Sequence, residues 1–115
     1  MTRPGWRVRL SDRAATDFAE IIDWTIDEFG THRANTYIAL LMRCLRTLEG
    51  GPYVTGTQDR AALQPGLRSI RALRTRHVVL FRAPPDTAGG TITVLRILHD
   101  AMDPARHLPQ AEDPA

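Results

Sequence analysis

The sequence has 115 residues, of which 43% are hydrophobic and 24% are charged, and its formal net charge at pH 7 is +2. This length allows one domain with a modest core and excludes a multidomain protein. No apolar stretch approaches the roughly 18 residues of a membrane-spanning helix and no signal-peptide pattern follows Met1, so we expect the protein in the cytoplasm.

The charges are unevenly distributed along the chain. All 15 basic residues are arginines, and eight of them lie between residues 60 and 106, where there are three acidic residues. Arginine suits a surface that binds phosphates or carboxylates through its planar fork, but a genomic base bias produces the same composition. An anionic partner should therefore meet this part of the chain first.

The N-terminal part is expected to hold one strand and two helices. Residues 6–10 alternate apolar and basic side chains, which is typical of a strand with one covered face. Ser11 is a suitable N-cap for a helix over residues 12–29, and Gly30 ends that helix. A second helix begins at Thr31 and stops before Gly50-Gly51-Pro52. So short a connection predicts an antiparallel helical hairpin.

Each predicted helix has an apolar stripe at spacings of three and four. In the first helix, Asp17 and three other acidic residues are assigned to the remaining surface, and the stripe comprises Ala14, Phe18, Ile21, Ile22, Thr25 and Phe29. The second stripe includes Tyr37 and Cys44, which we expect to be a buried thiol. Off both stripes lie Trp24, Leu40 and Met42. These three side chains either pack within the hairpin or, if exposed, receive an amphipathic partner helix.

The rest of the chain is expected to form a sheet. Residues 53–65 are rich in Gly, Thr and Gln without periodicity and predict a loop. Residues 67–73 and 77–82 predict a β-hairpin with arginines at its turn, and Pro84-Pro85-Asp86 breaks it. Gly89-Gly90 then leads into residues 91–98, an apolar and β-branched run. We interpret this run as the central strand, covered on both faces.

The predicted order is therefore β-α-α-β-β-β. It defines an α+β fold with a helical hairpin packed on a small, mostly antiparallel sheet. We expect a single domain over residues 6–108, with residues 1–5 and 109–115 as frayed termini.

The sequence contains few chemical motifs. The four histidines do not form a His-x3-His pair, Cys44 is alone, and no Gly-rich phosphate loop or nucleophile motif occurs. We therefore expect no metal or cofactor, and two mechanisms remain open. One remaining mechanism is RNA cleavage, in which arginines hold the phosphodiester and a histidine moves protons; its candidates are Arg71, Arg76, Arg96, His77 and His99. The other is docking of the C-terminal tail into another protein, with Met102, Leu108 and the arginines as anchors.

Several segments together resemble a known family. They are Pro65-Gly66-Leu67-Arg68-Ser69-Ile70-Arg71, residues 77–82 (HVVLFR), residues 94–103 (VLRILHDAMD) and Arg106-His107-Leu108. With the element order, they resemble the ParE branch of the RelE/ParE toxins of bacterial toxin-antitoxin modules over about residues 6–108. The resemblance implies two helices packed on a compact sheet, a cognate antitoxin whose C-terminal region wraps the toxin, and autoregulation through the DNA-binding part of the antitoxin.

The branches of this superfamily differ in their targets. Members that cleave mRNA on the ribosome carry an arginine at the start of the third strand, a basic residue after the fourth and often an aromatic hydroxyl near the end. Here His77, Asp100 and His107-Leu108 take these places, and a carboxylate repels a phosphate. The pattern resembles ParE, whose known target is DNA gyrase, bound without a chemical step.

The sequence thus predicts a non-enzymatic toxin that inhibits gyrase and is neutralised by an antitoxin, with no membrane partner and no sequence-specific nucleic-acid binding. The expected target-binding residues are Arg71, Arg74, Arg76, Arg96, His99, Met102, Asp103, Arg106 and Leu108. The expected antitoxin-binding residues are Trp24, Tyr37, Leu40 and Met42. The alternatives are a RelE-like mRNA endonuclease and a non-toxic scaffold.

Overall fold

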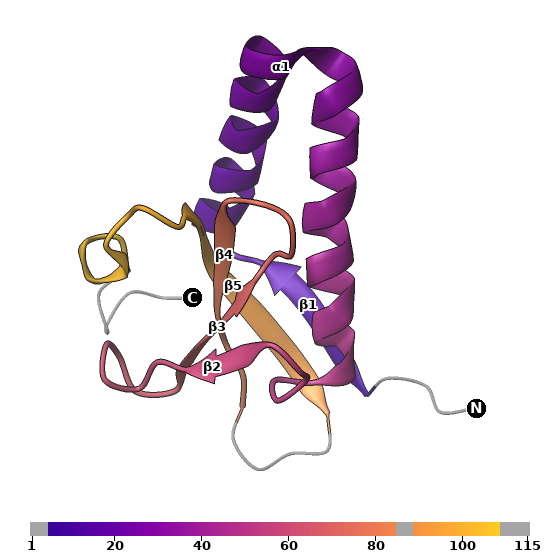
Figure 1. Ribbon diagram of the computed structural model, residues 1–115. Helices are drawn as coiled ribbons and strands as arrows, with labels where there is room; N and C mark the ends of the chain where they lie inside the picture. Colours follow the sequence, from indigo (N-terminus) through magenta and orange to yellow (C-terminus); the bar gives the residue numbers. More distant parts are fainter. Residues whose placement is uncertain (1–4, 85–88, 109–115) are drawn as a thin grey trace.

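The computed structural model describes residues 5–84 and 89–108. The expected break at Pro85-Asp86 and the expected frayed ends lie outside the described residues, apart from Gly5. Figure 1 shows a helical hairpin standing on one face of a sheet. Two of the elements, η1 and η2, are short 3-10 helices. In chain order the elements are β1 (Trp6–Leu10), α1 (Asp12–Thr47), η1 (Leu48–Gly50), β2 (Thr57–Asp59), β3 (Leu67–Arg71), β4 (His77–Arg82), β5 (Gly90–His99) and η2 (Pro104–Arg106).

The strands form one mixed sheet in the order β1-β5-β4-β3-β2. Only the β1–β5 pair is parallel among the described strands, so the prediction of a mostly antiparallel sheet is confirmed. Two details differ from the prediction. Within the expected loop, residues 57–59 pair with β3 as a strand too short to show periodicity. The run at residues 91–98 lies in an interior strand, as expected, but β4 occupies the middle of the sheet.

The element α1 consists of two antiparallel arms joined at Gly30, as Figure 1 shows. Gly30 has φ 85° and ψ 166°, a conformation that glycine adopts without a steric penalty, and it reverses the chain between the arms. Ser11 caps the first arm, because its hydroxyl accepts a hydrogen bond from the Ala14 N–H at 3.1 Å. The predicted hairpin and its N-cap are therefore confirmed. Phe29, which was assigned to the buried stripe, is instead exposed at the end of the first arm.

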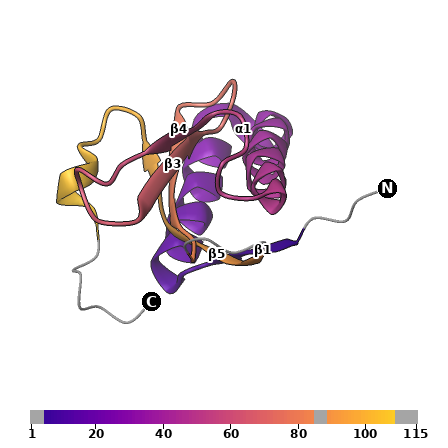
Figure 2. The same ribbon diagram turned by 90° about the horizontal axis from the view of Figure 1, so that it is seen from below.

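The sheet has an apolar cluster on each face. The larger cluster lies between the sheet and the hairpin and includes Ile92, Val94 and Ile97 of β5. The smaller cluster contains Leu95 and Leu98, together with Leu67, Leu80, Met102 and Leu108. The C-terminal segment therefore covers the face that the helices leave open, and Figure 2 shows it on the opposite side of the sheet from α1. The prediction that β5 is covered on both faces is confirmed.

A β-bulge in β5 determines which side chains face each cluster. Phe81 pairs with Val94 and the preceding Leu80 pairs with Arg96, so Leu95 is an extra residue in β5. The extra residue shifts the alternation of the strand. As a result, Val94 before the bulge and Ile97 after it belong to the same cluster.

Within residues 5–84 and 89–108, the structure contains no helix that is both long and apolar enough to cross a lipid bilayer.

Candidate functional site

A buried ion pair joins the first arm of α1 to β5. The Arg96 guanidinium donates from Nε and Nη2 to the two carboxylate oxygens of Asp17, at 2.8 and 2.9 Å. The Ile97 N–H donates to the same carboxylate at 2.9 Å. Because β1 ends at Leu10, which pairs with Val94, the Asp17 carboxylate replaces a neighbouring strand as the acceptor for this part of β5.

Both partners of this pair differ from the prediction. Asp17 was assigned to solvent, but it is 5% exposed and lies in a buried row with Ala14, Ile21 and Thr25. The spacing of three and four residues in that row was the signal that could have placed it inside. Arg96 was expected at the target-binding surface, but its side chain is buried against α1. Its Nη1 also donates to the His107 carbonyl at 2.7 Å, so it holds the C-terminal segment in place.

A polar cluster lies at the end of the sheet where β4 begins. The Tyr37 hydroxyl accepts a hydrogen bond from the Arg76 N–H at 2.9 Å and lies 2.6 Å from His77 Nδ1. We assign the hydroxyl as the donor to Nδ1, which leaves the His77 ring proton on Nε2. The His77 and His99 rings meet edge to face, with their centroids 5.6 Å apart. This cluster therefore ties the second arm of α1 to the β3–β4 turn.

The environment of His77 keeps its imidazole neutral. Burial, and then the nearby His99, lower the pKa of His77 from 6.5 to about 4, although Asp100 and Asp17 act in the opposite direction. A neutral ring with the proton on Nε2 and a hydrogen bond at Nδ1 has no free lone pair in its plane. In this arrangement the Nδ1 lone pair of His77 is engaged by the Tyr37 hydroxyl.

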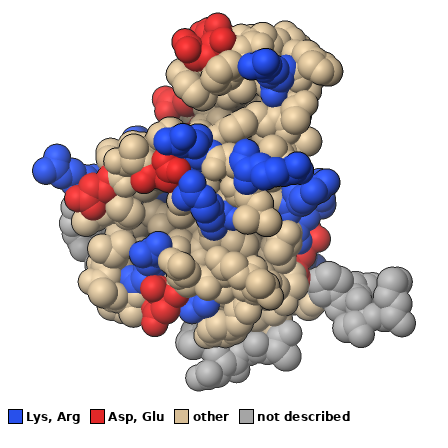
Figure 3. Space-filling view, viewed as in Figure 1, with Lys and Arg blue, Asp and Glu red and all other residues tan. Residues whose placement is uncertain are grey.

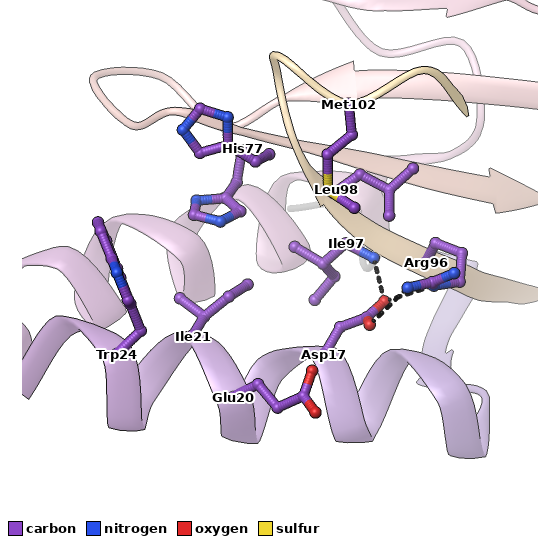
Figure 4. Close-up of a pocket in the computed structure, with 10 residues that line it drawn as sticks. Asp17, Glu20, Ile21, Trp24, His77, Arg96, Ile97, Leu98 and Met102 are labelled. Atoms are coloured by element: carbon purple, nitrogen blue, oxygen red, sulfur yellow. Dashed lines mark hydrogen bonds and ion pairs between the residues drawn. The ribbon is translucent and has the colours of Figure 1, made fainter. Parts of the chain in front are cut away.

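One cavity of about 250 Å³ brings together residues that RNA cleavage would need. His77, His99 and Arg96 line it, with Asp17, Glu20 and the apolar side chains of the first arm and β5. Figure 4 shows the Arg96 guanidinium turned to Asp17 on α1, with the Glu20 side chain on the same arm. All three guanidinium nitrogens of Arg96 donate to groups of the protein itself. Carboxylates here repel a phosphodiester, and the buried cation is already neutralised.

Two arginines of the expected target-binding set meet at Asp100. Arg71 Nη2 lies 2.6 Å and Arg76 Nε 3.5 Å from Asp100 Oδ2. The hydrogen bond from Arg71 and the charges of both guanidinium groups lower the pKa of Asp100. Asp100 thus stays ionised and orients two solvent-facing arginines at the end of the sheet.

The other residues of that set occupy two kinds of position. Met102 and Leu108 pack on the apolar cluster under the sheet, so they support the C-terminal segment from inside. Arg74 is exposed at the β3–β4 turn, with φ 63°. Asp103 and Arg106 are exposed in the C-terminal segment, where the Asp103 carboxylate accepts a hydrogen bond from the Ala105 N–H at 3.1 Å.

A second cavity, of about 260 Å³, lies between the second arm of α1 and β3. We call it the basic groove. Arginines form part of its wall, and apolar side chains and the Cys44 thiol form the rest. Its lining includes Leu40, Arg43, Cys44, Ile70, Arg71, Leu73 and Arg74. The groove therefore combines Leu40 of the expected antitoxin-binding set with Arg71 and Arg74 of the expected target-binding set. Arg43 and Leu73 were not predicted, although Arg43 follows Leu40 at the helical spacing of three.

The expected antitoxin-binding residues do not share one groove. Trp24 lines the cavity at Arg96, on the first arm, and is 49% exposed, with its ring edge to face against Phe29. Met42 is 38% exposed on the second arm. The Tyr37 hydroxyl is used within the chain. Only Leu40 of the four lines the basic groove.

The face of the molecule that carries the basic groove is rich in arginine. Figure 3 shows arginine side chains gathered across the middle of this face, beside the second arm of α1. Cys44 lines the groove and is buried, and its burial raises the pKa of its thiol to about 11. The prediction of a buried thiol is confirmed, and at neutral pH this thiol is uncharged.

Known proteins resemble this chain in both sequence and fold. Residues 8–104 match the model of the family described as ParE toxin of type II toxin-antitoxin system, parDE. Proteins named Toxin ParE1 from two strains of Mycobacterium tuberculosis are each 32% identical over 102 residues, which cover 89% of this chain and 97% of theirs. A solved structure titled Chromosomal ParDE TA system from P. aeruginosa superposes with a TM-score of 0.66 at 21% identity. It covers 83% of this chain and 96% of the other and shows that the two folds are alike.

The family model spans most of the described elements, from β1 to the start of η2, and the curated relatives match over nearly their whole length. The chain therefore belongs to the ParE toxin family of type II toxin-antitoxin systems.

Proposed function

We propose that this chain inhibits DNA gyrase by binding to it in the cytoplasm, without a chemical step, and that a cognate antitoxin neutralises it. Membership of the ParE family supports the toxin role. The ion pair between Arg96 and Asp17 is the observation that favours binding over catalysis. The only guanidinium among the described residues lining the cavity at His77 and His99 is paired with Asp17.

The charge at the end of the sheet supports the same choice. An RNA-cleaving site needs a cation over the developing negative charge and an imidazole that accepts a proton. Asp100 occupies the position between Arg71 and Arg76, and His77 already accepts a hydrogen bond from Tyr37. Asp100 and its two arginines form a fixed polar surface, which suits recognition of another protein.

The proposed gyrase-binding surface comprises the exposed members of the predicted set. Arg71 and Arg76 are oriented by Asp100, Arg74 lies between them at the turn, and His99, Asp103 and Arg106 continue the surface along the C-terminal segment. Arg96, Met102 and Leu108 act beneath it by fixing that segment to β5 and to the smaller apolar cluster. Loss of these internal contacts would displace the surface without removing any of its charges.

The proposed antitoxin-binding surface lies on α1. The solved relative is titled as a ParDE toxin-antitoxin system, and an antitoxin partner for this chain is inferred from it. Trp24 and Met42 expose large apolar area on the two arms, which a partner helix would cover. Leu40 extends this apolar surface into the basic groove.

Expression of the toxin alone, with separate measurements of plasmid supercoiling and of transcript cleavage, tests the proposal. We expect loss of negative supercoiling with intact transcripts, and inhibition of purified gyrase by the purified chain. An Arg71→Ala/Arg76→Ala variant should lose inhibition, whereas Arg33→Ala, exposed on the second arm, should retain it. Cuts in translated mRNA with gyrase unaffected would overturn the proposal in favour of an endonuclease. Absence of any growth defect would favour a non-toxic protein.

A further inference from the structure

The cavity of about 250 Å³ at His77 and His99 lies between the first arm of α1 and the end of β5, and we call it the first-arm cavity. Figure 4 shows its two sides. The arm contributes Asp17, Glu20, Ile21 and Trp24, and the opposite side contributes Ile97, Leu98 and Met102. Its volume lies below the roughly 300–1,000 Å³ of cofactor and drug-sized ligand sites, and it suits the end of one long side chain.

The charges that line the first-arm cavity do not cancel. Asp17 and Arg96 are paired, so they neutralise each other. The Glu20 carboxylate, about one helical turn after Asp17, has no ion pair or hydrogen bond with any of the described residues. Residues 12–29 hold six acidic residues and one basic residue, Arg13, which lies 3.9 Å from Asp17. Glu20 therefore leaves the cavity with an unbalanced negative charge, on an acidic helix that attracts cations.

The two histidines of the cavity do not supply the missing positive charge. The pKa of His77 is lowered to about 4, mainly by burial, so this ring is neutral at physiological pH. His99 Nδ1 accepts a hydrogen bond from the Ala101 N–H at 3.1 Å, which a protonated ring cannot do, and Asp100 Oδ1 lies farther from this nitrogen, at 3.4 Å. With both rings neutral, a ligand that carries one positive charge balances the cavity.

Trp24 gives the cavity an aromatic face beside this negative charge. It follows Glu20 by four residues, so the two side chains are neighbours on the helix surface. The indole is 49% exposed, and its edge-to-face contact with Phe29 holds the ring in place. A cation over an indole face and within reach of a carboxylate is attracted by both, and Ile21 and Leu98 offer apolar surface to an aliphatic stem. An arginine or lysine side chain combines such a cationic head with such a stem.

We propose that the first-arm cavity receives one arginine or lysine side chain of gyrase, with the cationic head between Trp24 and Glu20. The identity of the partner rests on the proposed function, whereas the preference of the cavity for an organic cation does not. The cavity borders the proposed gyrase-binding surface at His99, which belongs to both. Because Arg71 and Arg76 attract carboxylates and the cavity attracts a cation, the two sites together fix the orientation of the target.

Small probes test the chemistry of the cavity without gyrase. The probes are n-butylguanidinium and its neutral isostere n-butylurea, titrated into the folded, isotope-labelled chain at low salt and at about pH 7.5, above the ordinary imidazole pKa. The indole N–H resonance of Trp24 reports binding, and that of Trp6, outside the cavity, is the internal reference. Trp24→Leu assigns the two resonances. We expect n-butylguanidinium to bind at least about tenfold more tightly than n-butylurea.

One pair of variants tests the role of the unbalanced carboxylate. Glu20→Gln removes the charge and keeps the size of the side chain, and it should weaken binding of n-butylguanidinium about three- to fivefold. The matched control is Glu28→Gln, exposed on the same arm and outside the cavity, which should weaken binding less than about twofold. Equal binding of the two probes, equal losses in the two variants or equal shifts of the two indole resonances would overturn the cation site.

The gyrase measurement uses Glu20, because Trp24 also belongs to the proposed antitoxin-binding surface. Glu20→Lys should raise the concentration of the chain that half-inhibits purified gyrase at least about tenfold, since it replaces attraction by repulsion, and Glu28→Lys less than about threefold. Circular dichroism should be unchanged in both variants. If Glu20→Lys inhibits like the wild type while the probe binds as expected, gyrase is refuted as the source of the side chain. If the wild-type chain does not inhibit gyrase at all, the proposed function fails, and the probe titrations still decide the chemistry of the cavity.

Discussion

Replacement of Asp17 by alanine should strongly destabilise the fold, even though the substitution does not itself interrupt the α1 helix. The change removes the carboxylate that accepts from Arg96 and from the Ile97 N–H. Arg96 would remain 7% exposed between α1 and β5, without its counter-charge. A buried guanidinium in that position must either draw in water or break its packing.

The size of the effect follows from the removal of one partner of a buried ion pair. Such changes cost about 3–5 kcal/mol, because the remaining charge is left unpaired. The Ile97 N–H also loses its acceptor, and this cost is already part of the range of about 3–5 kcal/mol. A domain of this size has about 5–15 kcal/mol of stability in total, so the variant should be close to unfolding. Asp17→Ala/Arg96→Met, which removes both charges, should recover at least half of the loss.

Urea unfolding followed by tryptophan fluorescence and far-UV circular dichroism measures these differences. The control is Arg13→Ala, because Arg13 Nε lies 3.9 Å from Asp17 on an exposed side chain and should contribute less than about 1 kcal/mol. A loss below about 1 kcal/mol for Asp17→Ala, or a double variant no more stable than the single one, would refute the reasoning.

Three further predictions concern the hairpin and the polar cluster. Tyr37→Phe should lower the free energy of unfolding by about 1–3 kcal/mol in urea titrations, because the Arg76 N–H loses its acceptor and His77 its hydrogen bond. The pKa of His77 lies at about 4 in the fold, below its ordinary 6.5, so the unfolded chain binds the proton first. Stability should be complete above about pH 6.5 and fall as the pH drops towards 4, and His77→Gln should flatten that decline in urea midpoints measured across this range. Gly30→Ala should cost about 1–3 kcal/mol in thermal or urea unfolding, from backbone strain alone, since a Cβ there would meet no atom within 4 Å. An unchanged free energy of unfolding in this variant would contradict the strain argument.

The fold was largely predictable because each element carries a local signal. Alternation identified β1, Ser11 and Gly30 marked the start and end of the first arm, and the run in β5 required cover on both faces. The strand β2 was missed, since three residues carry no period and its pairing with β3 is a tertiary contact. Local sequence patterns identify elements that are long enough to show a repeated hydrophobic spacing, and β2 is too short to show one.

The candidate site was predictable only in part, because charge alone does not show whether a side chain is buried. The basic hairpin turn predicted Arg71, Arg74 and Arg76 as surface residues, and all three are exposed. Arg96 carries the same charge, and its burial depends on Asp17, a residue 79 positions away in the sequence. The polar residue within the apolar row at Ala14, Asp17, Ile21 and Thr25 was the available hint of a buried partner.

The parallel pairing of β1 with β5 also constrains when the chain acquires its structure during synthesis. Trp6 pairs with Gly90 and Leu10 with Val94, so the first strand has no neighbour in the sheet until almost the whole domain has left the ribosome. Contacts this distant in sequence close late and slow the folding reaction. A partner that recognises only the finished sheet therefore encounters this protein after translation, not on the nascent chain.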